Sequence, residues 1–132
     1  MAKYYFPAVF TLENNLYSIS FPDIKGCYSS AETLQEGLEN AQDALCLMLY
    51  DMEELGEAIP VPTDIKNIAL SDNQLVSLIP CDTLAYRKFF DSKAVKKTLT
   101  IPAWLNTMSE REDINFSAVL QEALKARLGI DN

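Results

Sequence analysis

Histidine is absent from the 132 residues of this chain. Its absence excludes Ser-His-Asp and Cys-His nucleophilic catalysis, and it excludes general acid–base chemistry by an imidazole. Zinc sites built from cysteine and histidine are excluded for the same reason. The commonest catalytic triads and histidine-bound metals are therefore not expected here.

Cysteine is scarce, and long apolar runs are lacking. Cys27, Cys46 and Cys81 show neither C-x-x-C spacing nor close pairing, which is typical of reduced thiols in a cytoplasm. No run of about 18 apolar residues exists, so the sequence predicts no membrane span and no membrane partner. The first residues lead into an aromatic segment that contains Pro7 and do not look like a signal peptide. We therefore expect a cytoplasmic protein.

The chain is acidic, with a formal charge of −8, but this charge is unevenly placed. Residues 1–80 contain 12 acidic and 3 basic side chains, a net charge of −9, whereas residues 81–132 contain 7 acidic and 8 basic ones, a net charge of +1. Because DNA phosphates repel an acidic surface, any DNA-binding element would lie in the C-terminal part. The N-terminal part should prefer a basic partner, although an acidic solvated surface alone would explain the same charge.

Alternating apolar and polar residues predict a mixed α+β domain in the first 90 residues. Four strands are expected, at 3–11, 16–21, 27–29 and 74–80. The first two should form a β-hairpin around Asn14 and Asn15, because asparagine accepts left-handed backbone angles. A short helix at 82–90, capped by Asp82 or Thr83, is expected to end the domain.

A long amphipathic helix is predicted between the third and fourth strands. Thr33 and Glu36 match a capping box, and Gly56 supplies the stop. The apolar positions recur in steps of four and three residues: Leu34, Leu38, Ala41, Leu45, Met48, Met52 and Leu55. Such spacing also suits a coiled coil, but Leu47, Leu49 and Tyr50 widen the apolar face and favour packing against a sheet. The other side should be a solvated face or a protein-binding surface, and it carries Glu36, Glu39, Asp43, Asp51, Glu53 and Glu54.

Residues 95–130 combine a short alternating strand with two helical patterns. In the strand, apolar residues alternate with Lys96, Thr98 and Thr100, and Pro102 then stops further pairing and suits a first helical turn. A unit of this size cannot bury its apolar faces alone, so we expect an intertwined homodimer with paired strands above four helices. Its core should contain Leu99, Ile101, Trp104, Val119, Leu120 and Leu124. A strand and helical hairpin packed on its own chain is the alternative.

This C-terminal pattern resembles the ribbon-helix-helix family of DNA-binding proteins, whose paired strands enter the major groove. It departs at Asp113, where that family usually has a glycine between its helices. The resemblance implies DNA contacts by Lys96, Lys97, Thr98, Thr100, Asn115 and Ser117.

The expected DNA contacts differ in kind. Lys97 has the wrong parity for the base-reading face, so it should contact phosphate or be partly solvated. Asn115 and Ser117 stand where a helix begins, and free backbone amides there attract phosphate. Both are also ordinary helix caps, which would explain their presence without DNA.

The N-terminal part resembles HicB-type antitoxins over roughly residues 4 to 80. The matching segments are Phe6-Pro7-Ala8, Tyr17 to Asp23, Gly26-Cys27, Thr33 to Ala41 and Ile59-Pro60-Val61-Pro62. Gly37 departs from the family, which more often has alanine there. The family has a partial RNase H-like domain (β-β-β-α-β) and one of two C-terminal modules, of which a ribbon-helix-helix (β-α-α) is one.

The resemblance implies a type II toxin–antitoxin function with two activities. Residues 1–90 would bind and inhibit a HicA-type toxin, a small basic RNA-cleaving protein. After a linker at 91–94, residues 95–132 would bind operator DNA as a dimer and repress the protein's own operon, and assembly beyond the dimer is left open. Toxin contacts are expected at Asp23, Glu36, Glu39 and Asp43.

Three other functions compete with this interpretation, and one of them, a metal-sensing ribbon-helix-helix repressor, lacks the obvious ligands because the chain has no histidine. RNase H enzymes hold two metal ions with clustered carboxylates, but the predicted strands carry almost no acidic residue. We therefore expect no catalysis, no metal site and no cofactor. The other alternative is a stand-alone ribbon-helix-helix repressor with a ligand-sensing N-terminal domain, which the absence of a small basic toxin gene nearby would favour.

Overall fold

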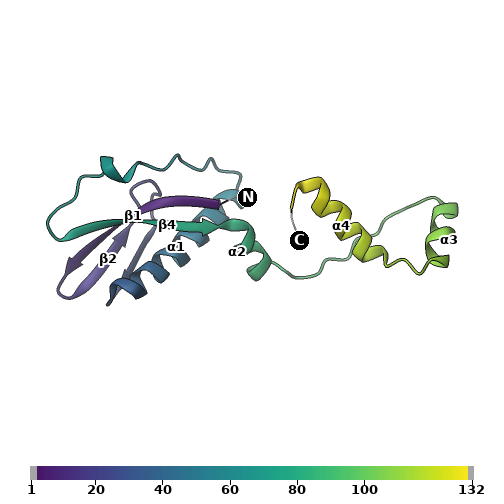
Figure 1. Ribbon diagram of the computed structural model, residues 1–132, viewed down its shortest axis with the longest axis horizontal. Helices are drawn as coiled ribbons and strands as arrows, with labels where there is room; N and C mark the ends of the chain where they lie inside the picture. The colour runs from purple at the N-terminus through teal and green to yellow at the C-terminus, as the bar shows by residue number, and fades with distance from the viewer. Residues whose placement is uncertain (1–2, 131–132) are drawn as a thin grey trace. The chain divides into compact units, whose positions relative to one another are not determined.

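The computed structural model describes residues 3–130 and divides into two compact units, between Lys93 and Ala94. The first unit contains β1 (Lys3–Glu13), β2 (Leu16–Ser20), β3 (Tyr28–Ala31), α1 (Leu34–Glu54), the short helix η1 (Ile65–Asn67), β4 (Gln74–Asp82) and α2 (Thr83–Phe90), as Figure 1 shows. The second contains α3 (Ala103–Arg111) and α4 (Phe116–Leu128).

The four strands form one antiparallel sheet in the order β3-β2-β1-β4. The predicted β1–β2 hairpin is confirmed, and its turn places Asn14 and Asn15 at φ 51° and 62°. Helix α1 then connects the β3 edge to the β4 edge, so the mixed α+β class is confirmed. The third strand begins at Tyr28 rather than Cys27, because the Cys27 amide donates to the Ile24 carbonyl in the preceding turn.

Helix α1 covers one face of the sheet and contributes a row of residues four apart to the core: Gly37, Ala41, Leu45 and Leu49. The predicted four-and-three spacing is therefore partly wrong, since Leu34 and Leu38 are 38% and 39% exposed. A row of residues four apart is inclined to the helix axis, so it can follow the twist of a sheet. A row that alternates steps of four and three residues runs nearly parallel to the axis and cannot. The predicted cap is confirmed, because the Thr33 hydroxyl accepts from the Glu36 amide at 3.1 Å.

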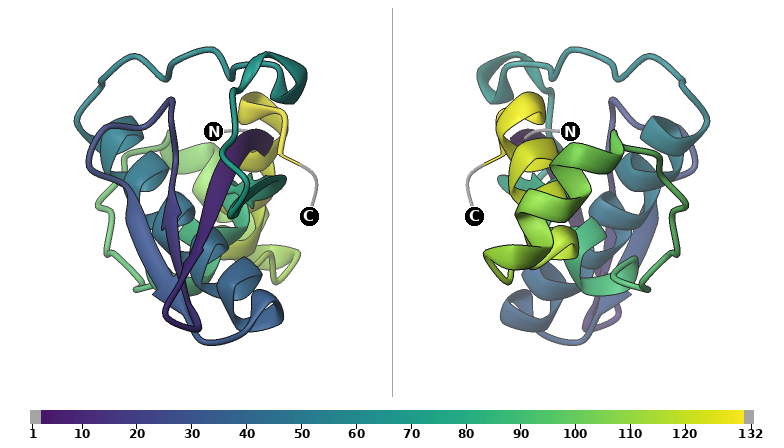
Figure 2. Two further views of the ribbon diagram at one scale, coloured as in Figure 1. Left: turned by 90° about the vertical axis from the view of Figure 1, so that its left-hand side faces the viewer. Right: turned by 90° about the vertical axis from the view of Figure 1, so that its right-hand side faces the viewer.

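The connector between α1 and β4, residues 57–73, runs on the other side of the sheet from α1 (Figure 1, Figure 2). It is fastened to the β2–β3 loop by Asp23, whose carboxylate accepts from the Thr63 amide at 3.0 Å and from the Thr63 hydroxyl at 2.6 Å. On this side of the sheet Pro7 and Val9 are buried. The aspartate that the sequence assigned to toxin binding thus has a structural role.

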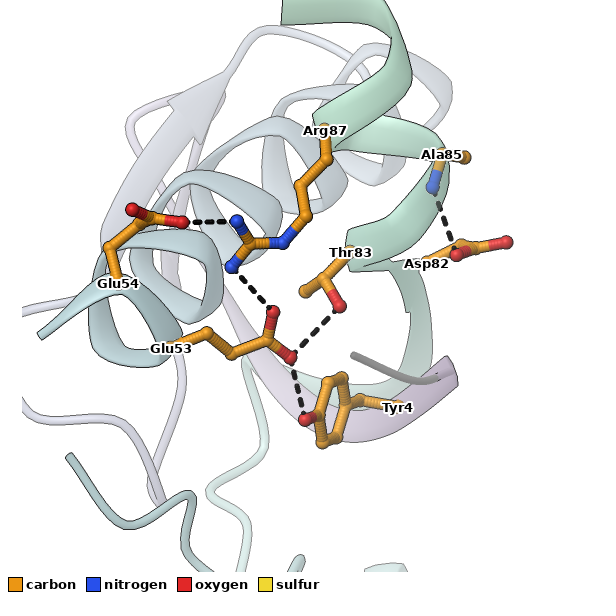
Figure 3. A network of polar contacts seen from close by, with 7 residues as sticks. All are labelled: Tyr4, Glu53, Glu54, Asp82, Thr83, Ala85 and Arg87. Carbon is orange, nitrogen blue, oxygen red and sulfur yellow. Dashed lines mark hydrogen bonds and ion pairs between the residues drawn. The ribbon is translucent and has the colours of Figure 1, made fainter. Parts of the chain in front are cut away.

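A polar network fastens α2 to the end of α1 (Figure 3). The Glu53 carboxylate accepts hydrogen bonds from the hydroxyls of Tyr4 and Thr83, at 2.8 and 2.9 Å, and from Arg87 Nη2 at 3.1 Å. The Arg87 guanidinium also pairs with Glu54 and lies 4.7 Å from the centre of the Tyr50 ring. These contacts fix the angle at which α2 leaves the sheet.

Glu53 departs from the prediction that it lies on the exposed side of α1. Its side chain is only 9% exposed, because it lies four residues beyond Leu49 and so continues the buried row. Burial alone raises the pKa of Glu53, but hydrogen bonds that include those from Tyr4, Thr83 and Arg87 outweigh it and lower the pKa to about 2. Burial, followed by the contact with Glu53, raises the pKa of Tyr4 to about 12.

The second unit departs from the sequence prediction in one element. The predicted strand at 95–101 has no ladder partner and is irregular in the single chain. A strand requires a neighbour for its backbone groups, and the described part of this chain offers none at that point. The predicted helical pair is present, and Asp113 adopts φ 52° in the turn between the helices, where glycine is usual in the ribbon-helix-helix family.

A Gly37→Val substitution tests the close approach of α1 to the sheet. A Cβ at Gly37 would lie 3.0 Å from Cε2 of Phe10 and 3.3 Å from Cδ1 of Ile19, both buried. We expect a loss of about 1–3 kcal/mol in the free energy of unfolding, measured by urea denaturation followed by circular dichroism. The matched control is Gln35→Val on the exposed side, with a loss below about 1 kcal/mol. Equal midpoints for the two variants would contradict the packing described.

A Glu53→Gln substitution tests the network through pH. The pKa of Glu53 lies near 2 in the folded protein and near 4.5 in the unfolded chain. The contribution of this carboxylate to the free energy of unfolding is therefore complete above pH 4.5 and is lost as the pH falls toward 2. A shift of this size corresponds to about 3 kcal/mol. We expect the stability gap between wild type and variant to narrow over this window in thermal denaturation. Glu39→Gln, on the exposed side of α1, should leave the wild-type pH profile unchanged, and a constant gap for Glu53→Gln would rule out the assigned role.

Candidate functional site

The second unit exposes the apolar side chains that its own fold should bury. Neither α3 nor α4 contains a buried residue. Trp104 and Leu99 are 65% and 59% exposed, Ile101, Val119 and Leu124 are also exposed, and Leu120 is half-buried. These are the six residues assigned to the dimer core. Exposed apolar surface of this kind is unusual for a soluble domain without a partner.

A groove of about 500 Å³ brings several of these side chains together. Four of the six predicted dimerisation residues line it, namely Leu99, Ile101, Val119 and Leu120, while Trp104 and Leu124 do not. Its remaining lining residues are Lys97, Asn106, Phe116, Ser117 and Ala123. The irregular segment and α4 therefore share one apolar groove.

The expected DNA contacts lie next to this groove. Lys96, Thr98 and Thr100 are exposed on the irregular segment. Lys97 instead lines the groove, together with Leu99 and Ile101, which also occupy odd-numbered positions. Asn115 is the N-cap of α4, because its side-chain oxygen accepts from the Ala118 amide at 3.1 Å. The capping explanation is thus confirmed for Asn115, and DNA contact by any of these residues stays a prediction.

The acidic residues of the first unit fall into different roles. Glu36, Glu39 and Asp43 are exposed on α1. Asp23 holds the connector, and Glu53 holds α2. Of the four residues named for toxin contact, Glu36, Glu39 and Asp43 have side chains without a structural role described above, and toxin contact stays a prediction for all four.

A second groove, of about 540 Å³, lies between α1 and α2. Its lining residues are Gln42, Asp43, Cys46, Leu47, Asp82, Ala85, Tyr86 and Phe90. Sequence analysis did not identify this groove, although two signals pointed to it. Leu47 and Tyr50 widen the apolar face of the long helix beyond its core row, and two phenylalanines end the short helix.

Burial and nearby carboxylates shape the electrostatics of this second groove. Burial, followed by the charge of Asp51, raises the pKa of Tyr86. A hydrogen bond to Cys81 lowers the pKa of Cys46, and the same bond, together with burial, raises the pKa of Cys81. Cys46 is half-buried and Cys81 is buried, so the thiol with the lowered pKa is the one at the groove.

Neither a metal cluster nor a membrane-spanning helix is found within residues 3–130. No group of three or more histidine, cysteine, aspartate or glutamate side chains there is placed to hold a metal ion. Over the same residues, no helix has the length and apolar character needed to cross a membrane.

Known proteins resemble this chain in both sequence and fold. The chain is 32% identical over 104 residues to an uncharacterized 14.9 kDa protein in the rep-hol intergenic region of Haemophilus phage HP1. The matched region covers 76% of this chain and 74% of that protein. A chain of the toxin-antitoxin complex from Streptococcus pneumoniae superposes with a TM-score of 0.62 at 24% identity, over 95% of this chain and 99% of that one. The antitoxin HicB of Burkholderia pseudomallei superposes with a TM-score of 0.54 at 21% identity, over 92% and 96% of the two chains.

The superpositions establish the fold, and a match to a family model establishes which family the chain belongs to. Residues 5–123 match the model described as the HicB_like antitoxin of bacterial toxin-antitoxin system. This match spans both units and nearly the whole chain, and it confirms the resemblance found in the sequence. The chain therefore belongs to the HicB-like antitoxin family of bacterial toxin–antitoxin systems.

Proposed function

We propose that this protein inhibits a HicA-type RNA-cleaving toxin through residues 1–90 and represses its own operon through residues 95–132, which bind operator DNA as a ribbon-helix-helix dimer. It acts by binding and not by catalysis, in the cytoplasm. The family assignment supports the antitoxin role, and solved structures of similar fold include chains of toxin–antitoxin complexes. The β-β-β-α-β order of the first unit supports a partial RNase H-like domain.

The main support for the proposed dimer is the exposed apolar surface of the second unit. Two segments 95–101 that pair antiparallel would supply each other's missing strand partner and cover both grooves. Six half-covered apolar side chains from each protomer would contribute on the order of 10–20 kcal/mol when buried. The cost of association is about 4–15 kcal/mol, so burial of this size can drive dimerisation.

The charge pattern supports DNA as the ligand of the paired segments. The parity that turns Leu99 and Ile101 into the groove leaves Lys96, Thr98 and Thr100 on the opposite side of the segment. In a dimer this side presents six such residues on a two-stranded ribbon, which fits the major groove. The acidic first unit would not approach phosphate, so DNA binding belongs to the second.

A double substitution, Thr98→Ala with Thr100→Ala, tests base reading. Four hydroxyls would be lost per dimer, so we expect affinity for DNA from upstream of the gene to fall more than tenfold in fluorescence anisotropy. Thr107→Ala is the matched control, because that hydroxyl donates to the Ala103 carbonyl within α3. Unchanged DNA affinity in the double variant would show that this face does not read bases.

A Leu120→Glu substitution separates the two activities. A carboxylate in the dimer core should leave the protein monomeric in sedimentation equilibrium and abolish DNA binding. The same variant should still rescue growth when co-expressed with the toxic product of the adjacent gene. Gln121→Glu, at an exposed neighbouring position, should behave as wild type. A dimeric Leu120→Glu protein would refute the dimer core, and loss of rescue despite a folded first unit would refute the division of activities.

A further inference from the structure

We propose that the groove between α1 and α2 is the docking site for the toxin, and that it receives an apolar side chain flanked by lysine or arginine. The proposal rests on the proposed function and assigns it to one surface of the first unit.

The walls of the groove are apolar and open to solvent. Leu47 of α1 is 50% exposed, and Phe90 of α2 is 66% exposed. The aromatic rings form a continuous row, with centroid distances of 5.1 Å from Tyr50 to Tyr86, 4.5 Å from Tyr86 to Phe90 and 4.7 Å from Phe90 to Phe89. Rigid aromatic side chains beside a concave surface are typical centres of protein–protein interfaces. The groove can therefore accept a protruding apolar side chain.

Carboxylates surround this apolar groove. Asp43 and Asp82 line it, and the charges of Asp51 and Asp91 act on the adjacent rings of Tyr86 and Tyr50. The basic residues of α2 do not neutralise these carboxylates. Arg87 is already paired with Glu53 and Glu54, so Lys88 is the one basic side chain of α2 that remains against them. Aromatic faces and carboxylates together attract cations. The segment that fits the groove is thus apolar at its tip and basic at its sides.

The same charges argue against a second copy of this chain as the occupant. Two such grooves facing each other across a two-fold axis would place Asp43 and Asp82 of one protomer against the same residues of the other. Like charges that meet in this way oppose association. A basic toxin meets no such repulsion, and the net charge of −9 over residues 1–80 would accelerate its approach.

The groove is preformed. The network of Tyr4, Glu53, Thr83 and Arg87 fixes α2 against α1, and Asp82 caps α2 by accepting from the Ala85 amide at 3.1 Å (Figure 3). A partner would not need to order either helix on binding, which reduces the entropic cost of the complex.

The first test blocks the groove with an Ala85→Arg substitution in the full-length chain. Ala85 is exposed and lines the groove, so an arginine there fills it with a cation without entering the core. We expect affinity for the purified toxin of the adjacent gene to fall at least 100-fold in isothermal titration calorimetry, with an unchanged thermal midpoint and unchanged DNA binding. The matched control, Ala69→Arg, is exposed in the connector and should bind as wild type.

The second test uses the wild-type chain and needs no substitution. Cys27 and Cys81 are 1% and 2% exposed, whereas Cys46 is half-buried and lines the groove, so iodoacetamide should label Cys46 preferentially. We expect bound toxin to slow this alkylation at least tenfold, as measured by mass spectrometry of the labelled peptides.

The outcomes separate the two proposals. If wild-type protein fails to bind the toxin at all, the proposed function itself is wrong. If the wild type binds, but Ala85→Arg binds equally well and Cys46 is alkylated at the same rate in the complex, the toxin docks elsewhere and only the groove assignment is overturned. Protection of Cys46 at high protein concentration without toxin would identify a second copy as the occupant and also overturn it.

Discussion

The contact between α1 and the sheet is the constraint on which the first unit depends. The row from Gly37 to Leu49 lies so close to the sheet that a Cβ at the first of these positions would be only 3.0 Å from the Phe10 ring. The same row ends in Glu53, a carboxylate that reaches the end of the sheet instead of solvent. Helix α2 is fastened to that carboxylate. The rotation of one helix about its axis therefore determines both the core and the groove.

The second unit obeys a different constraint, which is its size. Two short helices and an extended segment cannot enclose a core, so every large apolar side chain of α3 and α4 remains at least partly exposed. In the first unit, apolar residues are used to fold one chain. In the second they are available for association, and the polar residues between them are available for a ligand.

Much of the first unit could be predicted from the sequence because its signals are local. The N-cap at Thr33, the asparagine turn after β1 and the cap at Asp82 each depend on residues within a few positions of one another. The buried row of α1 was partly mispredicted because the orientation of a helix on a twisted sheet is a tertiary property. The sequence pattern places Glu53 on the exposed side of α1 for the same reason, since its partners Tyr4 and Thr83 lie 49 and 30 residues away in the chain.

The candidate sites were less predictable than the fold. The alternation of residues 95–101 predicts a strand, but a strand needs a partner for its backbone groups. Under the proposed function that partner would come from a second copy of the chain. The α1–α2 groove depends on how two helices diverge, and no local pattern specifies that angle. The resemblance to a family supplied the general function, whereas the placement of individual residues required the structure.

The missing strand at 95–101 has a consequence for regulation. Under the proposed function, toxin binding needs one folded first unit and therefore depends on the first power of the chain concentration. Operator binding needs two chains to complete one ribbon and depends on the second power. When the protein is dilute, inhibition of the toxin would persist while repression weakens, and synthesis would resume. Under this proposal, a segment that is incomplete in the monomer would make repression a sensor of how much protein the cell contains.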